Sequence, residues 1–323
     1  MSICLRSFRN TDLKHICRIW NEHHFESKLG TRLTPLQFEI CVLAKPNFSA
    51  ENFFIAELDD IPCGFLYLDL EIEAETGEFC PSANISAFCV SPCAEDEPIA
   101  GALLTKALDY CFQSKVQTCQ FRPLFPANLL FVGLGPGDSM IGLTSSERRL
   151  CDWLTQGGFT ALIPTNLWQL DVSTFQQPSD RVQLGIRRSS YVDRLLEEPE
   201  LSWKVACLLG HAELSEFHLI NRQSRQITCD SLIWTLDPEL SQRAEYIAWL
   251  WPLDQQIALG KADESLFLLG EAIRQLQQDG VDYVRTASIA NQNIQANLLS
   301  RLGFIPFQSG VVFEYSFQLA QSL

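Results

Sequence analysis

The sequence lacks three features that would assign it to a class at once. It has no run of about 18–20 apolar residues, the length that a membrane-spanning helix needs, so no such helix is expected. Its first residues, Met1-Ser2-Ile3-Cys4-Leu5-Arg6, have no basic segment followed by an apolar core, so no secretory signal is expected. None of the 12 cysteines belongs to a CxxC pair, which removes the commonest ligand spacing of structural zinc sites.

Positive charge is also scarce. The chain has 24 Lys and Arg against 39 Asp and Glu, a formal net charge of −15. Such a field repels phosphate backbones and anionic lipid headgroups, so neither a nucleic acid nor a membrane is an expected partner. Ten of the cysteines lie between Cys4 and Cys151, mostly inside apolar runs. Buried free thiols are typical of a reducing compartment, so a cytoplasmic location is expected.

What is present is the material for two domains. At 323 residues the chain exceeds the size at which single cores usually stop growing. A polar stretch at 173–182 shows no hydrophobic periodicity and is the expected linker between domains 1–172 and 183–323. Hydrophobic patterns and turn residues predict strands in the first half at 3–6, 53–58, 63–70, 83–90, 118–121 and 167–172, with helices at 12–20, from 34, at 99–112 and at 145–154. In the second half they predict strands at 217–220, 226–234, 246–251, 281–286 and 311–317, with helices at 202–209, 265–278 and 291–302.

The two halves share an internal spacing. Ala100 near the start of one helix and Val116 at the next strand are 16 residues apart, as are Ser265 and Val281. Each half then has a helix that ends in Gly-Phe, at 158–159 and 303–304. This repetition predicts a duplicated α/β domain, each copy a mixed, mostly antiparallel twisted sheet flanked by helices.

The order of the elements resembles the GNAT superfamily of acyl-CoA-dependent N-acetyltransferases, over about the whole chain. The residues that carry the resemblance are 5–8 with 12–20, the hairpin 54–65, Val90-Ser91-Pro92 with Leu103-Leu104, and 291–304. The resemblance implies acetyl-CoA as the acyl donor and an amine, on a small molecule or a peptide, as the acceptor. It implies no metal.

In that family a loop written Q/R-x-x-G-x-G/A opens the third helix, and its backbone N–H groups hold the coenzyme A pyrophosphate. In the first half this loop falls on 95–100, where three acids and Pro98 favour a helix cap over a phosphate site. In the second half, counting from Pro252 gives Gln255–Gly260, and counting back from Leu268 gives Gly260–Ser265. The first count is preferred, and the cofactor residues that it implies are Leu250, Pro252, Gln255, Gln256, Ala258, Gly260 and Lys261.

The catalytic residues are less well defined by the sequence. Deprotonation of an amine needs a base near the fourth strand, and Glu245 and Asp254 flank that strand in the second half. The tyrosine that serves the family as general acid falls on Leu154 and Leu299, so both halves lack its hydroxyl. Two functions therefore stay open. One is an N-acyltransferase with its cofactor in the second half, and the other is a tandem binding or regulatory module without catalysis.

Three further patterns are expected to carry no chemistry of their own. The acids in 69–75 alternate along a strand and are expected to form a solvated face. The glycine-rich stretch 131–138 has Asp138 where a dinucleotide fingerprint needs glycine, so it is expected to be a loop at the substrate cleft. The pair His23-His24, His211 and His218 have no partners at metal-ligand spacing in the sequence.

Overall fold

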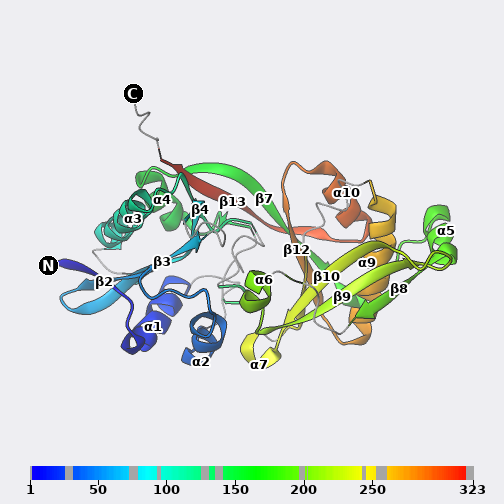
Figure 1. Ribbon diagram of the computed structural model, residues 1–323, viewed down its shortest axis with the longest axis horizontal. Helices are drawn as coiled ribbons and strands as arrows, with labels where there is room; N and C mark the ends of the chain where they lie inside the picture. Colours follow the sequence, from blue (N-terminus) through cyan, green and yellow to red (C-terminus); the bar gives the residue numbers. More distant parts are fainter. Residues whose placement is uncertain are drawn as a thin grey trace. The chain divides into compact units, whose positions relative to one another are not determined.

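The computed structural model describes residues 2–25, 32–72, 79–92, 96–124, 131–134, 141–195, 201, 203–241, 245–251 and 260–317. It divides into two compact units (Figure 1). The first unit takes its residues from Met1–Pro164 and Gly310–Leu323, and the second from Thr165–Ser309. Among the described helices, none combines the length and the apolar character that crossing a bilayer requires.

The first unit contains a sheet with helices on both faces. Its elements are β1 (Ile3–Ser7), α1 (Leu13–His23), α2 (Pro35–Phe38), β2 (Phe53–Leu58), β3 (Ile61–Ile72), β4 (Phe79–Val90), α3 (Asp96–Gln113), β5 (Thr118–Phe121), β6 (Leu143–Thr144) and α4 (Arg148–Gln156). The strand order is β1-β2-β3-β4-β5, followed by the C-terminal strand β13 (Ile305–Ser316). The β4–β5 pair is parallel and the other pairs are antiparallel.

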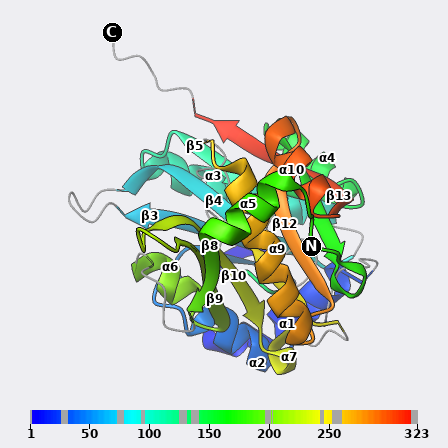
Figure 2. The same ribbon diagram turned by 90° about the vertical axis from the view of Figure 1, so that its right-hand side faces the viewer.

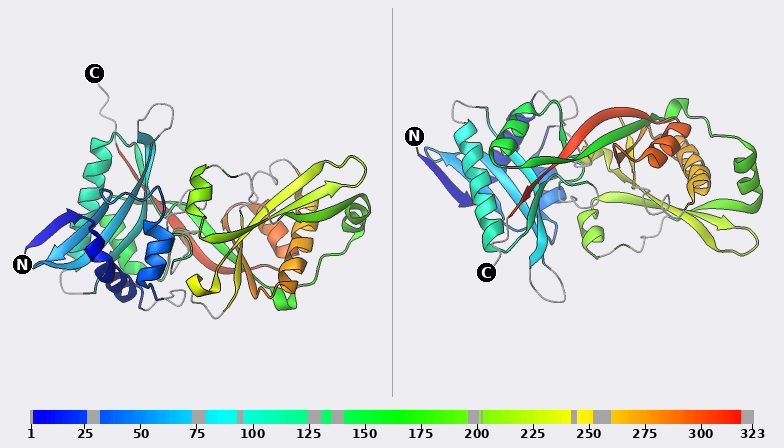
Figure 3. Two further views of the ribbon diagram at one scale, coloured as in Figure 1. Left: turned by 60° about the horizontal axis from the view of Figure 1, so that its bottom comes forward. Right: turned by 90° about the horizontal axis from the view of Figure 1, so that it is seen from above.

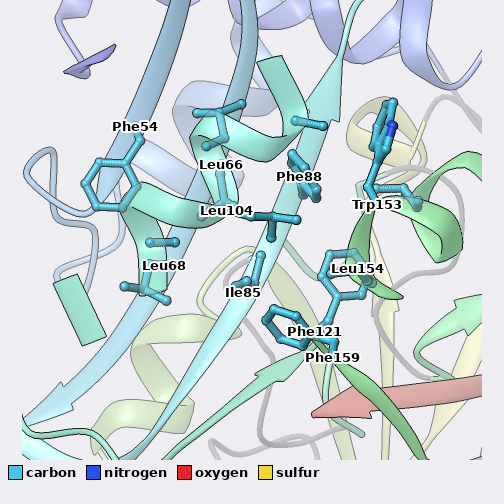
Figure 4. Packing of buried hydrophobic residues seen from close by; sticks show 14 of the residues in the cluster. Phe54, Leu66, Leu68, Ile85, Phe88, Leu104, Phe121, Trp153, Leu154 and Phe159 are labelled. Atoms are coloured by element: carbon cyan, nitrogen blue, oxygen red, sulfur yellow. The ribbon is translucent and has the colours of Figure 1, made fainter. Parts of the chain in front are cut away.

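Strand β3 shows why this sheet needs two helical layers. Residues 62–68 are buried without a break, so successive side chains enter opposite cores. Leu66 and Leu68 belong to the cluster that α3 and α4 cover (Figure 4). Phe65 faces the other way and stacks on Trp20 of α1, with ring centroids 6.4 Å apart. Helices α1 and α2 therefore lie on the face opposite α3 and α4 (Figures 1 and 3).

The second unit repeats this plan. Its elements are α5 (Arg181–Ser189), β8 (Ser190–Leu195), α6 (Trp203–Leu208), β9 (Ala212–Asn221), β10 (Ile227–Leu236), α7 (Pro238–Ser241), β11 (Ile247–Leu250), α9 (Ala262–Gln278), β12 (Tyr283–Ile289) and α10 (Asn293–Arg301). The strand order is β8-β9-β10-β11-β12, followed by β7 (Thr160–Asp171). Only β11–β12 is parallel. Helix α9 lies across the sheet beside α5 (Figure 2) and buries Leu266, Leu269 and Ile273 in the core.

The predicted duplication is visible in how α4 and α10 end. The backbone N–H of Phe159 donates to the carbonyl of Leu154 at 2.9 Å, and that of Phe304 donates to Leu299 at 3.0 Å. The glycine before each phenylalanine has φ near +87°, at 86° in the first copy and 88° in the second. Only glycine adopts this conformation without strain, which explains the Gly-Phe pair in both halves.

The last strand of each half pairs with the other half's fifth strand. Strand β7 follows α4, yet its residues 165–171 pair with β12 in the second unit. Strand β13 follows α10, yet its residues 313–316 pair with β5 in the first unit. The compact units are therefore not the contiguous ranges 1–172 and 183–323 that the sequence predicts. Hydrophobic patterns locate strands but do not say which sheet a strand joins.

The expected linker at 173–182 also has a structure. Phe175 packs against the core of the second unit, and Gln177 Nε2 donates to Glu271 Oε1 of α9 at 3.0 Å. Helix α5 begins at Arg181, capped by Asp180, whose carboxylate accepts from the N–H of Gln183 at 2.9 Å. The sequence analysis did not predict α5 or β8. Helix α5 buries only Gln183, so it carries no apolar stripe that periodicity could detect.

Candidate functional site

The parallel strands of the second unit part at Leu250. Pairing of β11 with β12 ends at Trp249 and Arg285. Past that point the N–H of Trp251 still donates to Leu232 of β10 at 2.9 Å, so β11 stays with β10 and leaves β12. The Thr286 hydroxyl donates to the Leu250 carbonyl at 3.1 Å, where the next ladder bond would lie. The result is a split whose two edges carry backbone polar groups.

Helix α9 begins at this same end of the sheet. Because β11 and β12 are parallel, the helix that connects them runs back, and its N-terminus lies at the carboxyl end of β11. Gly260 and Lys261 stand immediately before it. Gly260 has φ +74° and is exposed, and a Cβ there would meet no atom within 4 Å. The first N–H groups of a helix have no partner inside it, so this end is suited to hold an anion.

The charges around this helix end are mixed. Lys261 Nζ donates to the carbonyl of Thr228 at 2.6 Å, which anchors the residue to β10. Asp263 and Glu264 stand in the first turn, and Asp263 accepts from Arg301 Nη1 at 3.1 Å. Arg301 also holds Asp180 at 3.2 Å. One of the two first-turn carboxylates is therefore balanced by a guanidinium.

The predicted site residues fall into three groups. Leu250, Gly260 and Lys261 belong to the split end of the second unit. Glu245 is exposed at the opposite end of β11, five residues from Leu250, which corresponds to about 16 Å at the rise of a strand. The structure therefore does not bring Glu245 to the split. Pro252, Asp254, Gln255, Gln256 and Ala258 lie outside the described residues.

The corresponding place in the first unit is filled. The last paired residues of β4 and β5 are Ile85 and Phe121, and Val90 lies beyond them on β4. The N–H of Ser91 donates to Cys63 of β3, so the polar backbone groups of Val90 point away from β3, toward the split. There His23 Nδ1 lies 3.1 Å from the Val90 carbonyl oxygen and 3.3 Å from its nitrogen. The α1 side chain thus occupies the free strand edge.

Helix α3 of the first unit also has a partner at its N-terminus. Asp96 in the first turn forms an ion pair with Arg149 of α4, and Glu97 adds a second acid. The guanidinium of Arg149 lies over the ring of Trp153, 5.3 Å from its centroid. Trp153 in turn is 6.2 Å from the His23 ring (Figure 4 shows Trp153 beside Phe88). A chain of contacts therefore links the start of α3 to His23 through Arg149 and Trp153.

A group of largely buried polar side chains lies near His23 in the first unit. His24 Nε2 lies 3.6 Å from Cys89 Sγ, and Arg122 Nη1 lies 2.7 Å from Glu147 Oε1. Burial lowers the pKa of His23 to about 4 and holds that of His24 well below its ordinary value, whereas burial raises the pKa of the Cys89 thiol. Arg122 has φ +44°, an uncommon backbone conformation for a non-glycine residue. The sequence analysis missed this group because its members come from four separate segments.

An open groove of about 1440 Å³ also lies on the first unit. It runs between α1, the start of α2 and the β2–β3 hairpin, and Lys14, Arg18, Arg32 and His24 are among its lining residues. Arg18 is held by the Pro62 carbonyl at 2.5 Å and by Glu22 at 3.0 Å.

The two positions at which the resemblance would place a tyrosine lie in the hydrophobic cores. Leu154 and Leu299 are both 0% exposed, each inside the hydrophobic cluster of its unit. Figure 4 shows Leu154 between Phe159 and Trp153. A hydroxyl at either place would be surrounded by apolar side chains.

Comparison with known proteins supports the fold. No protein-family model matches the sequence, and no curated protein matches it. Several solved structures match the fold of this chain. A glucosamine N-acetyltransferase region in a fungal multi-domain β-N-acetylglucosaminidase superposes with a TM-score of 0.69 at 11% identity, over 97% of this chain and 38% of that one. This chain thus spans well under half of that protein's length.

Two further structures match over most of both chains. A tandem GNAT protein from the clavulanic acid biosynthesis pathway has a TM-score of 0.64 at 11% identity, covering 99% of this chain and 100% of its own. Saccharomyces cerevisiae N-myristoyltransferase with bound myristoyl-CoA has a TM-score of 0.56 at 9% identity, covering 98% and 80%. The fold is therefore that of a tandem GNAT protein, two mixed α/β units in one chain, as the sequence predicts.

Proposed function

We propose that this protein is an acyl-CoA-dependent N-acyltransferase that binds acetyl-CoA in its second unit. The observation that carries the proposal is the contrast between the two splits. In the second unit α9 is preceded by Gly260, where an added Cβ would meet no atom within 4 Å, and among the described residues no helix side chain bonds to the edge of β11 as His23 does to that of β4. In the first unit His23 of α1 occupies the free edge of β4.

The chemistry of the cofactor fits the second unit. A pyrophosphate next to α9 would gain from the helix dipole and from N–H groups that have no partner inside the helix. The positive φ and open surroundings of Gly260 allow phosphate oxygens to approach the backbone closely. Gly260, the last residue of the loop that the sequence favours, lies directly before the Lys261 N-cap.

The proposed reaction is attack by an unprotonated amine on the thioester carbonyl, with the thiolate of coenzyme A as leaving group. An amine needs a base to become a nucleophile. Of the two predicted carboxylates, Asp254 comes after the carboxyl end of β11 in the sequence, whereas Glu245 precedes its other end, so we assign Asp254 to this role. The acceptor is an amine of a small molecule or a peptide, and a similar fold occurs in a glucosamine N-acetyltransferase region.

A second function is supported by one specific observation. Leu154 and Leu299 are fully buried, so neither unit offers a hydroxyl at the place where the family protonates the leaving thiolate. A tandem module that binds acyl-CoA or another ligand without turnover is consistent with that. The described cysteines are free thiols, most of them buried, which supports a cytoplasmic location for either function.

A thermal melt with and without acetyl-CoA tests the cofactor proposal. A ligand at about 100 times its Kd should stabilise the second unit by about 2.7 kcal/mol, which raises its melting temperature by several degrees. Gly260→Asp should abolish the shift by placing a carboxylate at the phosphate site. Gly280→Asp is the matched control, because Gly280 is exposed at the other end of α9 with φ +81° and open surroundings.

Turnover separates the two functions. Release of free thiol from acetyl-CoA in the presence of an amine panel, lost in Gly260→Asp and kept in Gly280→Asp, would support the transferase. A melting shift without thiol release would support the binding module. No shift at millimolar acetyl-CoA would contradict both forms of the cofactor proposal.

A further inference from the structure

One cluster of ligand-type side chains lies outside the proposed cofactor site. His23 and His24 end α1, and Cys89 lies on β4. Each offers one possible ligand atom, and these three atoms lie within 4.8 Å of one another. We propose that His23, His24 and Cys89 bind a zinc ion in the first unit.

The distances suit a shared ion. Zinc bonds of about 2.3 Å to sulfur and about 2.0–2.1 Å to nitrogen, at a tetrahedral angle, place the two ligand atoms about 3.6 Å apart. His24 Nε2 and Cys89 Sγ are 3.6 Å apart. The His23 nitrogen lies within 4.8 Å of the other two atoms, so it would have to move by at most about 1.4 Å to reach the separations of about 3.4–3.6 Å that a shared ion sets.

The backbone of β4 orients His23 for this role. Metal-binding histidines usually donate their second ring N–H to a carbonyl or carboxylate, which fixes the tautomer. His23 Nδ1 lies 3.1 Å from the Val90 carbonyl oxygen, to which it can donate, and 3.3 Å from the Val90 nitrogen, from which it can accept in the other tautomer. When Nδ1 donates to the carbonyl oxygen, Nε2 carries the lone pair. The contact of His23 with Val90 thus leaves His23 Nε2 available to bind a metal ion.

The donor set and its surroundings favour zinc. One thiolate and two neutral imidazoles form a borderline-soft set, which zinc prefers over the hard ions calcium and magnesium. On binding, Cys89 loses its proton to solvent, so one proton is released per ion and the site gains one net positive charge. Arg122 nearby is already paired with Glu147 at 2.7 Å. His24 also lines the open groove, which gives the ion a path from solvent.

This cluster could not be found from spacing. The sequence analysis expected no metal because the histidine pair has no ligand nearby along the chain. Cys89 is 65 residues beyond His24. It reaches the pair only because α1 ends beside β4 in the folded unit.

Cobalt is the probe that reports directly on a thiolate ligand. The full-length chain is stripped with a chelator and then titrated with Co²⁺, followed by competition with Zn²⁺. We expect one Co²⁺ per chain, a thiolate-to-cobalt charge-transfer band, and its displacement by one equivalent of Zn²⁺. Cys89→Ala should abolish the band. Cys119→Ala is the control, since it removes another fully buried thiol of the same unit and should keep the band.

A second variant guards against a folding artefact. His24→Asn removes one nitrogen ligand and should weaken zinc binding by more than the roughly 10- to 100-fold that loss of an outer-shell partner costs. All variants are checked by melting of the metal-free protein. No charge-transfer band in the wild-type chain, or unchanged zinc affinity in folded Cys89→Ala or His24→Asn, would overturn the proposal.

Discussion

The Thr286 hydroxyl donates to the backbone carbonyl of Leu250 at 3.1 Å, at the point where β11 and β12 part. Both residues are buried, so water cannot easily replace this bond. A side chain thus satisfies the carbonyl that loses its ladder partner when the strands separate. Thr286 therefore stabilises the separation of β11 from β12.

Replacing that threonine tests the arrangement. Thr286→Val keeps the shape but leaves the Leu250 carbonyl unpaired, so the free energy of unfolding of the second unit should fall by about 1–3 kcal/mol. Thr286→Ser keeps the hydroxyl and should lose less. Chemical unfolding of both variants measures the difference. Equal losses would mean that methyl packing, and not the hydrogen bond, is what matters.

Strand β7 pairs with β12 of the second unit, and β13 pairs with β5 of the first unit. A substitution in β13 should therefore destabilise the first unit. Phe313 of β13 is buried in the core of the first unit, although its position in the chain follows the second half. Phe313→Ala should destabilise that unit by about 3–5 kcal/mol. Hydrogen exchange should show the loss of protection in β5.

A control on the same strand makes this prediction specific. Phe307 belongs to the second unit and is 42% exposed, so Phe307→Ala should cost less and leave β5 protected. Loss of protection in β9 and β10 after Phe313→Ala, with β5 unchanged, would contradict the strand assignment.

Acid should weaken the ion pair between β1 and the start of α1. Burial acts to raise the pKa of Asp12, but hydrogen bonds from the Arg6 guanidinium and the Arg9 N–H outweigh it, so the pKa lies below its ordinary 3.8. A lowered folded pKa stabilises the protein above the unfolded value, and this contribution is lost as pH falls through the folded one. Asp12→Asn should therefore lower the free energy of unfolding by about 2 kcal/mol at pH 7. When the pH is lowered, the free energy of unfolding of this variant should decrease less than that of the wild type.

The control for this test is an exposed acid. Asp59→Asn changes a residue of the β2–β3 turn with φ +48°, a conformation that asparagine tolerates. Unfolding at pH 7 and about pH 3 should show the same acid sensitivity for this variant as for wild type. An unchanged acid sensitivity in Asp12→Asn would contradict the role of the pair.

Restoring the missing tyrosine should fail. Leu299 is 0% exposed, so Leu299→Tyr adds volume and a hydroxyl to a closed core and should cost about 1–3 kcal/mol without raising thiol release. Leu299→Met, which conserves volume, should cost less. A stable Leu299→Tyr variant with faster turnover would show that this position opens to the cofactor.

The sequence predicted much of the fold but less of the site. Local periodicity was sufficient for the hairpin of β2 and β3, for α3 and α9, and for the equal ends of α4 and α10. It was insufficient where partners come from distant segments. Strand β13 reaches β5 across the whole second half, and Cys89 reaches His24 through the packing of α1 on β4. Glu245 was predicted as a base from its nearness to β11, and the structure places it at the end of β11 away from Leu250, so its role as a base stays a prediction.

The central claim is that the second unit holds the cofactor. Hydrogen exchange with and without millimolar acetyl-CoA tests it most directly, because it reports the binding position without a mutation. The account predicts slower exchange at the start of α9, from residue 260 to 265, and at 247–251, with no change at 96–100 or 88–92. Protection confined to the start of α3 would place the cofactor in the first unit and contradict the claim.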